Sequence, residues 1–236
     1  MAYKLKLERK EEILKDTYGL YFDKNDSGIK FLAGQFFTVT IPDLNATDGK
    51  GNERHFSIAN APGEKQIEII IRKSGSDFSN AILNLPIGAQ LLFDEPRGEI
   101  HSKKIYESNF IPVFIAGGTG ITPVRSILRD FNEREIDKEL ILFYANRSVE
   151  TSVFLSEFEN LDKEKNNFTF IPILEEGSET IKTERGYFSE EIFKKYVKEI
   201  YRHVFFVTGP PMMLSEAIKV LVNSGVPEDK IFIENI

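Results

Sequence analysis

The chain has 236 residues, a formal net charge of −7 and no cysteine. The negative charge disfavours general nucleic-acid binding, and the lack of cysteine excludes disulfides, thiolate metal sites and cysteine-bound iron–sulfur clusters. His55, His101 and His203 show no metal-ligand spacing, so we expect no metal site. Because no apolar run reaches the roughly 18 residues of a membrane helix, and the N-terminus alternates like a strand, we expect a cytoplasmic protein without a membrane span.

The first hundred residues show the pattern of short β-strands. Tyr3, Leu5 and Leu7 alternate with polar residues, and aromatic or β-branched runs follow at 18–22, 36–41, 67–71 and 89–93. Turn residues separate these runs at short intervals. The pattern predicts an antiparallel β-barrel or sandwich, interrupted by one short helix at about residues 78–85.

From about residue 109 onward, predicted strands alternate with predicted helices. Apolar runs at 113–116, 140–144, 168–174, 203–207 and 231–236 indicate strands. Helical spacing appears at 124–131 and 151–161, after Ser189, and from Met213 to Gly225. Such alternation implies an α/β parallel-sheet domain covered on both faces. We therefore predict two domains, residues 1–103 and 109–236, with the polar stretch 102–109 as the boundary.

A glycine-rich turn follows the first strand of the second half. Gly117, Gly118 and Gly120 end that strand, and Thr122 is a candidate N-cap with Pro123 in the first helical turn. A strand, a glycine turn and a helix N-terminus together bind pyrophosphate through backbone N–H groups. A plain strand–helix turn has the same pattern, so the rest of the chain must decide.

Arg54-His55-Phe56-Ser57 resembles the Arg-x-aromatic-Ser/Thr flavin motif of the ferredoxin–NAD(P) reductase-like flavoproteins. The resemblance also covers, in the family's order, the segments 34–36, 76–83, 96–98, 117–123 and 209–212, together with Gly88. Each marker is weak alone, but the ordered set is specific. The resemblance implies a flavin-binding barrel, an NAD(P)-binding domain and FAD as the cofactor, without an iron–sulfur domain.

The resemblance also implies a set of flavin contacts. Arg54 would bind the FAD pyrophosphate, Phe56 would pack on the flavin or ribityl chain, and Ser57 would hydrogen-bond near flavin N5. The resemblance adds a second flavin segment and a helix start whose N–H groups would bind the pyrophosphate. The further residues of the flavin site would then be His55, Ile71, Arg72, Lys73, Phe78, Ser79 and Asn80. A surface salt bridge for Arg54 and a simple N-cap for Ser79 are the alternative readings.

For the pyridine nucleotide, the resemblance implies two loops at the carboxyl edge of the sheet. They contain Gly117, Gly118, Thr119, Gly120 and Thr122 in the first loop, and Gly209, Pro210 and Met212 in the second. Thr208 stands where many family members have a cysteine beside the nicotinamide, and Glu234 resembles a carboxylate near the active site. We therefore assign catalytic roles to Ser57, Thr208 and Glu234, although a glutamate at a strand end is often only solvated.

The expected function is an FAD-dependent oxidoreductase that takes a hydride from NAD(P)H and passes electrons to a separate acceptor, such as ferredoxin or an oxygenase component. The alternatives are a free-flavin reductase and a non-catalytic electron-transfer subunit of a larger complex. NADH is favoured over NADPH, because Glu175 and Glu176 follow the third strand of the second domain and would repel a 2′-phosphate. Arg147, near the expected adenosine ribose, and Arg185 could instead bind that phosphate.

Overall fold

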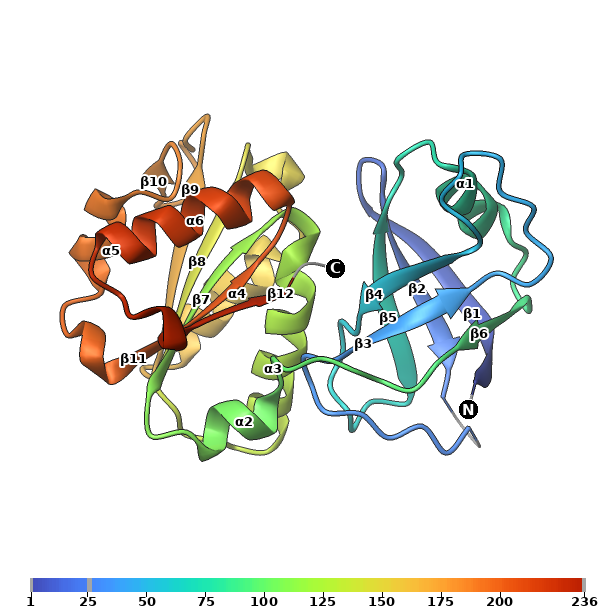
Figure 1. Cartoon of the computed structure of the whole chain (residues 1–236), viewed down its shortest axis with the longest axis horizontal. Coiled ribbons are helices and arrows are strands. Elements are labelled where there is room, and N and C mark those ends of the chain that lie inside the picture. Colours follow the sequence, from blue (N-terminus) through green and yellow to red (C-terminus); the bar gives the residue numbers. More distant parts are fainter. Residues whose placement is uncertain (1, 25–26, 235–236) are drawn as a thin grey trace. The chain divides into compact units, whose positions relative to one another are not determined.

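The computed structural model describes residues 2–24 and 27–234, which separate into two compact units (Figure 1). The first unit contains the residues up to Lys103 together with Arg125–Glu135, and the second contains Lys104–Val124 and the residues from Ile136 onward. The domain ranges 1–103 and 109–236 stay predictions. Within the described ranges, the helices are too short or too polar to cross a bilayer.

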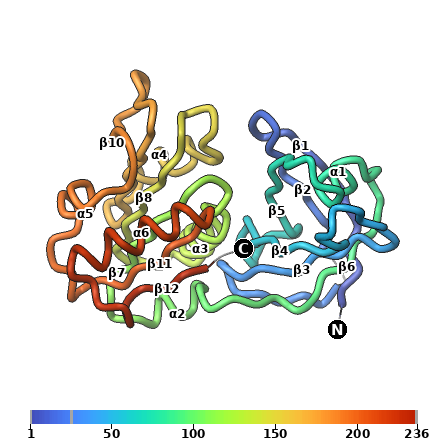
Figure 2. The backbone as a smooth tube through the Cα atoms, turned by 45° about the horizontal axis from the view of Figure 1, so that its top comes forward, coloured from blue at the N-terminus to red at the C-terminus, as the bar shows by residue number. Residues whose placement is uncertain are grey.

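The first unit is an antiparallel barrel of six strands, in the order β4-β3-β6-β1-β2-β5. The ends of the sheet meet where Ile58 bridges Ile69 and the Ala59 N–H donates to the Glu68 carbonyl at 2.8 Å. This closure confirms the predicted barrel. Figure 2 shows the backbone path of these strands. The strands are β1 (Tyr3–Leu14), β2 (Thr17–Asp23), β3 (Phe36–Thr40), β4 (Glu53–Ser57), β5 (Gln66–Arg72) and β6 (Gln90–Phe93).

Alternating side chains fill the barrel. Leu5 and Leu7 of β1 and Phe22 of β2 are buried, and the Phe93 ring packs edge-on against Phe22 and Phe37, with centroids 4.9 and 5.5 Å away. One helix, α1 (Asp77–Asn84), packs Phe78 and Ile82 into the barrel core. It begins close to the position expected from its sequence.

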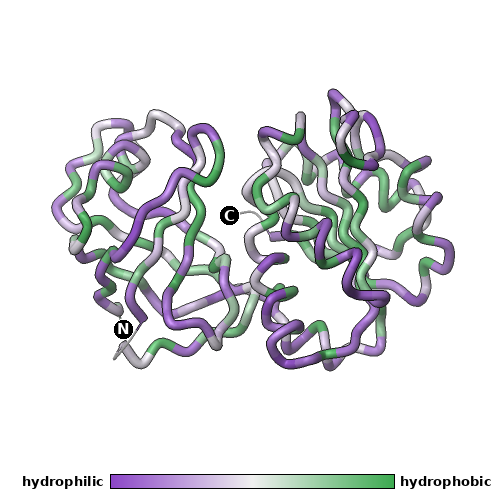
Figure 3. Tube along the Cα trace, turned by 180° about the vertical axis from the view of Figure 1, so that it is seen from behind, coloured by the Kyte–Doolittle hydropathy of each residue, from purple (hydrophilic) through white to green (hydrophobic). Residues whose placement is uncertain are grey.

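The second unit is a parallel sheet of six strands, in the order β10-β9-β8-β7-β11-β12, which confirms the predicted α/β domain. Figure 3 shows that hydrophobic residues gather in these strands. The strands are β7 (Ile111–Gly117), β8 (Leu140–Asn146), β9 (Phe168–Leu174), β10 (Glu184–Arg185), β11 (His203–Thr208) and β12 (Ile231–Glu234). Residues 235 and 236 of the predicted last strand lie outside the described residues.

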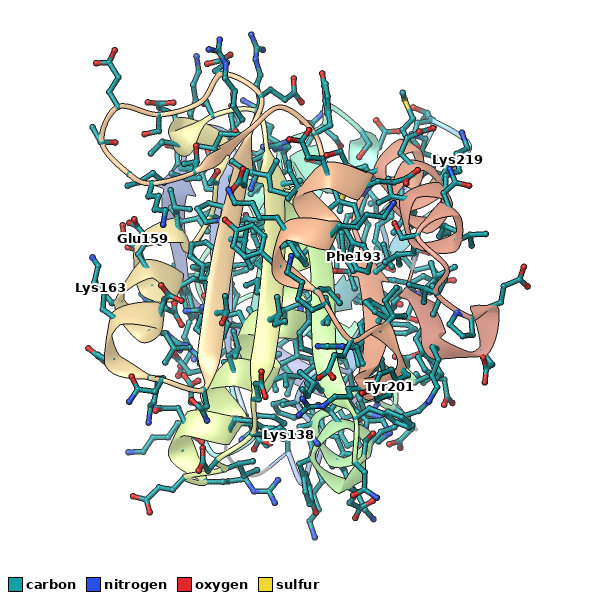
Figure 4. All side chains as sticks on the ribbon, turned by 90° about the vertical axis from the view of Figure 1, so that its left-hand side faces the viewer. Lys138, Glu159, Lys163, Phe193, Tyr201 and Lys219 are labelled. Atoms are coloured by element: carbon teal, nitrogen blue, oxygen red, sulfur yellow. The ribbon has the colours of Figure 1, made fainter. Side chains whose placement is uncertain are left out.

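Helices cover both faces of this sheet. Phe193 of α5 (Glu190–Tyr196) and Leu221 of α6 (Pro211–Asn223) pack on the face that carries Phe143 and Phe205. Phe158 of α4 (Leu155–Glu164) packs on the other face, against Phe170 and Tyr144. Figure 4 shows Phe193 directed toward the strands, whereas Glu159 and Lys163 point away from them. The remaining helices are α2 (Ser102–Glu107) and α3 (Thr122–Glu133), with 3₁₀ turns at Gly118–Ile121, Val149–Thr151, Ile200–Arg202 and Glu228–Lys230.

Two segments differ from their sequence predictions. The polar stretch 102–109, for which the sequence predicts only a domain boundary, contains α2. The helix expected at 151–161 begins at Leu155, because Ser148 caps a separate 3₁₀ turn and Phe154 then adopts a left-handed backbone at φ 61°. Hydrophobic spacing alone does not report such a cap.

Candidate functional site

The candidate site of the barrel unit is built around Arg54 in β4. Its Nη1 donates to the carbonyls of Lys50, Gly51 and Glu53 at 2.7, 3.3 and 2.6 Å. Its Nη2 lies 4.0 Å from Asp48 Oδ2 and is buried with no hydrogen-bond partner in residues 2–24 and 27–234. The loop therefore fixes the guanidinium and leaves one of its donors for a ligand.

The face of β4 that carries Arg54 also carries Phe56. The Phe56 ring lies 5.9 Å from that of Phe78 in α1, and the Arg54 guanidinium carbon lies 5.1 Å from the Phe78 ring centroid. His55 points to the opposite face, where its Nδ1 lies 3.1 Å from Thr38 Oγ1. The structure thus brings Arg54, Phe56 and Phe78 together and separates His55 from them.

The start of α1 lies beside this group. Ser76 caps the helix by accepting from the Ser79 N–H at 3.2 Å, and the buried Ser79 hydroxyl accepts from the Ser74 N–H at 3.1 Å. Asn80 is exposed and donates from Nδ2 to the Gly75 carbonyl at 3.2 Å. Ser79 therefore braces the loop that leads into the helix, and the cap itself is Ser76.

Asp77 binds the neighbouring loop to the same helix start. Its Oδ2 accepts from the Thr47 N–H and hydroxyl at 2.5 and 2.9 Å and from the Asp48 N–H at 3.1 Å. The hydrogen bonds from Thr47 hold the pKa of Asp77 below its usual value. The loop that holds Arg54 and the start of α1 consequently form one hydrogen-bonded network.

The second predicted flavin segment ends β5. Ile71 is buried in the barrel core, whereas Arg72 and Lys73 are exposed. The Lys73 N–H donates to the Asp16 carbonyl at 2.8 Å. Ile71 can therefore meet a cofactor only through its backbone, and the two cations remain at the surface.

In the second unit, the predicted glycine turn leads from β7 through a 3₁₀ turn into α3. Gly117 has extended backbone, and Gly118 has φ +54°. Thr122 is not the N-cap that the sequence predicts, since its backbone is already helical and its hydroxyl donates to the Thr119 carbonyl at 2.5 Å. The extra 3₁₀ turn moves the helix start away from the strand end.

The glycine loop is interlocked with the loop that follows β11. A Cβ on Gly120 would lie 2.6 Å from Gly209 Cα, and one on Gly117 would overlap the Met213 sulfur. The buried Thr208 hydroxyl donates to the Gly120 carbonyl at 2.7 Å. Thr208 therefore uses its hydroxyl to join the two loops.

Sequence reasoning missed two side chains that hold Gly118. The Tyr144 hydroxyl donates to the Gly118 carbonyl at 3.0 Å, and Asn146 Oδ1 accepts from the Gly118 N–H at 3.2 Å. Asn146 Nδ2 is buried and has no hydrogen-bond partner among the residues described. Both residues lie at the carboxyl end of β8, and a polar residue at that edge of a parallel sheet is the signal that could have identified them.

Charged side chains surround the ends of β8 and β9. Arg147 Nε donates to Glu176 Oε1 at 2.8 Å, and the Tyr187 hydroxyl donates to Glu175 Oε2 at 3.0 Å. The backbone supports this arrangement, because the Glu176 N–H donates to the Arg147 carbonyl at 3.1 Å. Arg147 and Glu176 thus form an ion pair on an exposed surface.

Glu234 ends β12 and pairs in register with Thr208 of β11. Its side chain is buried, its Oε2 has no hydrogen-bond partner within the described ranges, and burial raises its pKa to about 8. Glu234 is therefore mostly protonated at neutral pH. A buried carboxyl of this kind can donate a hydrogen bond or exchange a proton.

The last predicted contacts lie around the start of α6, where Met212 belongs to the first helical turn and not to the loop that the sequence predicts. Pro210 directly precedes the helix, and the Met212 side chain is 83% exposed. The contacts described above bring four predicted site residues together. Thr208 binds the Gly120 carbonyl and pairs with Glu234, and Gly120 lies against Gly209. Ser57, the third predicted catalytic residue, ends β4 in the barrel unit and pairs with Phe36.

Both halves of the chain match known domains. Residues 4–102 match the family described as "Oxidoreductase FAD-binding domain", and residues 114–219 match "Oxidoreductase NAD-binding domain". The phenol hydroxylase P5 protein of Acinetobacter pittii is 32% identical over 216 residues, which cover 89% of this chain and 58% of that protein. The chain thus spans under two thirds of that relative.

Two further proteins match over most of their own length. A probable flavin reductase of Aliivibrio fischeri is 29% identical, over 89% of this chain and 86% of that protein. The structure of a ferredoxin NADP+ reductase from Neisseria gonorrhoeae with bound FAD and NADP superposes with a TM-score of 0.83 at 19% identity, and the match covers 99% of this chain and 98% of that chain. The structural likeness shows the fold. The two domain matches, in this order, show that the chain belongs to the oxidoreductases that combine an FAD-binding with an NAD-binding domain, which is the domain pair of the ferredoxin–NAD(P) reductase-like flavoproteins.

Proposed function

We propose that this protein is an NAD(P)H-dependent flavoprotein reductase that passes electrons to a separate acceptor. The observation that carries the proposal is the buried Nη2 of Arg54 beside Phe78 of α1, which lies 4.0 Å from Asp48 and has no hydrogen-bond partner among the described residues. A buried guanidinium nitrogen without a partner is costly, and a pyrophosphate oxygen would satisfy it. These residues therefore fit FAD, which would supply hydride acceptance and one-electron release.

The chain's own residues have separate tasks in this proposal. Arg54 and the N–H groups at the start of α1 bind negative charge, and Phe56 supplies an aromatic surface. In the sheet, Gly118 allows a nucleotide to approach the backbone closely, because an added Cβ there would meet no atom within 4 Å, whereas Gly120 allows the two loops to pack together. Ser57 donates a hydrogen bond at the flavin edge, and Glu234 carries a proton in its buried carboxyl.

The acceptor that we favour is a protein, namely ferredoxin or an oxygenase component. The phenol hydroxylase P5 protein supports a role in an oxygenase system. A free-flavin reductase is the second candidate, and the likeness to the probable flavin reductase favours it, because this chain spans 86% of that protein. The proposed location is the cytoplasm, in keeping with a soluble electron carrier as partner.

A desalting experiment separates these two candidates. The purified protein is loaded with FAD, passed through a desalting column and assayed with NADH and a one-electron acceptor such as ferricyanide. An electron-transfer reductase retains its FAD and reduces the acceptor without added flavin. A free-flavin reductase emerges colourless and consumes NADH only after flavin is added. If neither preparation consumes NADH or NADPH, the proposed function is wrong.

We also propose a preference for NADH. Arg147 is engaged by Glu176, and Tyr187 is engaged by Glu175, so that two carboxylates lie where a 2′-phosphate would need cations. The test compares kcat/KM for NADH and NADPH at one salt concentration, in the parent and in Glu176→Gln. We expect a ratio that favours NADH in the parent and narrows in the variant. A parent that prefers NADPH would assign the 2′-phosphate to Arg147 or Arg185.

A further inference from the structure

Helix α3 belongs to both units of the chain. The 3₁₀ turn Gly118–Ile121 runs directly into Thr122, and residues Lys104–Val124 group with the parallel sheet. From Arg125 to Glu135 the chain groups with the barrel. The chain therefore passes from one unit to the other within the first turn of α3.

Arg125 forms a buried ion pair in the barrel. Its Nη1 donates to Glu68 Oε2 at 2.7 Å and to the Ala59 carbonyl at 3.0 Å, and the two charged residues are 5% and 3% exposed. Glu68 Oε1 also accepts from the Tyr21 hydroxyl at 3.1 Å. Because both charges are desolvated, the pair has strict geometric requirements.

Ser126 makes a second buried connection. Its hydroxyl donates to the Asn60 carbonyl at 2.7 Å and accepts from the Gly34 N–H at 3.2 Å. The backbone of Gly34 is close to the helix, since a Cβ there would lie 2.8 Å from the Ile127 side chain. The first turn of α3 is therefore hydrogen-bonded to two separate barrel segments.

Both barrel segments are continuous with the flavin motif. Ala59 and Asn60 directly follow the Ser57-Ile58 dipeptide, and the Ile58 N–H donates to the Gln35 carbonyl at 3.0 Å. On its N-terminal side, the first turn of α3 directly continues the glycine loop. A movement of the first turn of α3 would thus reach the Gly118–Ile121 turn through only a few peptide bonds.

We propose that Arg125 and Ser126 are positioning residues, which anchor the first turn of α3 to the barrel and so restrict the motion of the glycine loop Gly117–Ile121. The proposal rests on the proposed function for its kinetic consequence. Hydride transfer depends on alignment of the two reacting groups, and a displacement of about 1 Å can cost about 100-fold in rate. A firmly held loop keeps a bound nucleotide in fewer orientations.

The next turn of α3 offers a matched control. Arg129 also pairs with a barrel glutamate, because its Nη1 lies 3.2 Å from Glu64 Oε1. Those two side chains are 34% and 33% exposed, so water and salt weaken the pair. Arg129→Met therefore removes an arginine–glutamate pair from the same helix without removing a buried anchor.

The experiment compares Arg125→Met, Ser126→Ala and the control Arg129→Met. The first readout is hydrogen–deuterium exchange at residues 117–124 in the flavin-free and nucleotide-free protein. We expect exchange in this segment to rise about tenfold in Arg125→Met and less in Ser126→Ala, with no change in the control. This readout does not depend on activity.

The second readout is the limiting rate of flavin reduction by NADH in the FAD-loaded protein. We expect this rate to fall about tenfold in Arg125→Met, with FAD affinity and the rate of reoxidation by ferricyanide within about twofold of the parent. If Arg125→Met does not fold, Arg125→Lys replaces it, because lysine keeps the charge and lacks the planar guanidinium.

Unchanged exchange and unchanged reduction rates in both anchor variants would overturn the proposal. Equal losses in Arg129→Met and in the anchor variants would also overturn it, because they would indicate general destabilisation of α3. Failure of the parent to be reduced by NADH would instead contradict the proposed function. In that case the exchange data alone would still decide whether Arg125 and Ser126 hold the loop.

Discussion

The candidate sites of the two units are built from different chemical groups. In the barrel, the contacts depend on charged and aromatic side chains, with Arg54 and Asp77 in one hydrogen-bonded network beside Phe78. In the parallel sheet, the loops are held by backbone proximity at Gly120 and Gly209, and the Thr208 hydroxyl bonds a carbonyl of the loop itself. The barrel presents charged and aromatic side chains, whereas the sheet loops present closely packed backbone.

This difference predicts opposite sensitivities to mutation. Shortening a side chain in the barrel site removes partners for a ligand and costs the fold little stability. Adding even one methyl group to the sheet half forces two backbones apart. The predictions below test this contrast in order of decreasing expected effect.

The largest effect is expected from Gly120→Ala. Its Cβ would lie 2.6 Å from Gly209 Cα and 2.7 Å from Gly209 N, and backbone atoms cannot rotate away. We expect NADH affinity to fall by about 100-fold or more, because overpacking of about 3 kcal/mol would separate the loops. Flavin reduction by dithionite should persist.

Gly225→Ala is the control for this prediction. Gly225 has a left-handed backbone, at φ +88°, which Gly120 does not have, and no atom lies within 4 Å of an added Cβ. We expect a stability loss of about 1 kcal/mol and unchanged NADH affinity. Equal NADH affinity in Gly120→Ala and the parent would contradict the claim that close packing of the two loops is needed for nucleotide binding.

The next effect is expected from Arg54→Ala. It removes the buried donor that we assign to the FAD pyrophosphate, and a charge-assisted hydrogen bond contributes about 1.5–3 kcal/mol. FAD affinity, measured by fluorescence quenching, should fall about tenfold or more. NAD⁺ affinity should stay the same, and an Arg54→Ala protein that binds FAD like the parent would remove the basis of the flavin assignment.

Glu234→Gln should change how stability depends on pH. Burial raises the pKa of Glu234 to about 8, so between about pH 4.5 and pH 8 the folded state holds a proton that the unfolded chain has lost. Stability therefore falls as pH rises through this window, by up to about 1.4 kcal/mol per pH unit. Thermal unfolding from pH 5 to pH 9 should show the slope in the parent and a weaker slope in Glu234→Gln. Parallel curves would indicate that Glu234 titrates normally.

The smallest effect is expected from Thr208→Val. The substitution keeps the shape of the side chain and removes the hydroxyl that donates to the Gly120 carbonyl. We expect a loss of about 1 kcal/mol in stability and a modest rise in KM for NADH. Thr208→Ser, which keeps the hydroxyl, should restore both values, and a large fall in kcat in Thr208→Val alone would indicate a direct catalytic role.

The sequence was most informative where local patterns decide the structure. The strand Phe168–Leu174 has the predicted bounds, and Ser189 caps α5 by accepting from the Ile192 N–H at 3.3 Å, as its position predicts. The glycine turn also follows its predicted strand. In each case the deciding residues are neighbours in the chain, so spacing and residue type carry the information.

Contacts between distant residues could not be predicted in this way. The partners of Arg125 and Ser126 lie more than 55 positions earlier in the chain, and their pairing depends on closure of the barrel. Asn146 binds the Gly118 N–H from 28 positions further along the chain. Thr122 was misassigned because the 3₁₀ turn at Gly118–Ile121, which depends on Tyr144 and Asn146, precedes the helix. The ligand contacts of both halves stay predictions.

Anaerobic titration of the FAD-loaded protein with NADH tests the central claim most directly. If the barrel binds flavin and the sheet binds the nucleotide for one reaction, about one equivalent of NADH should bleach the flavin absorption near 450 nm. The same addition should leave Gly120→Ala yellow, although dithionite bleaches it. A parent protein that holds FAD and stays yellow with both NADH and NADPH would contradict the account.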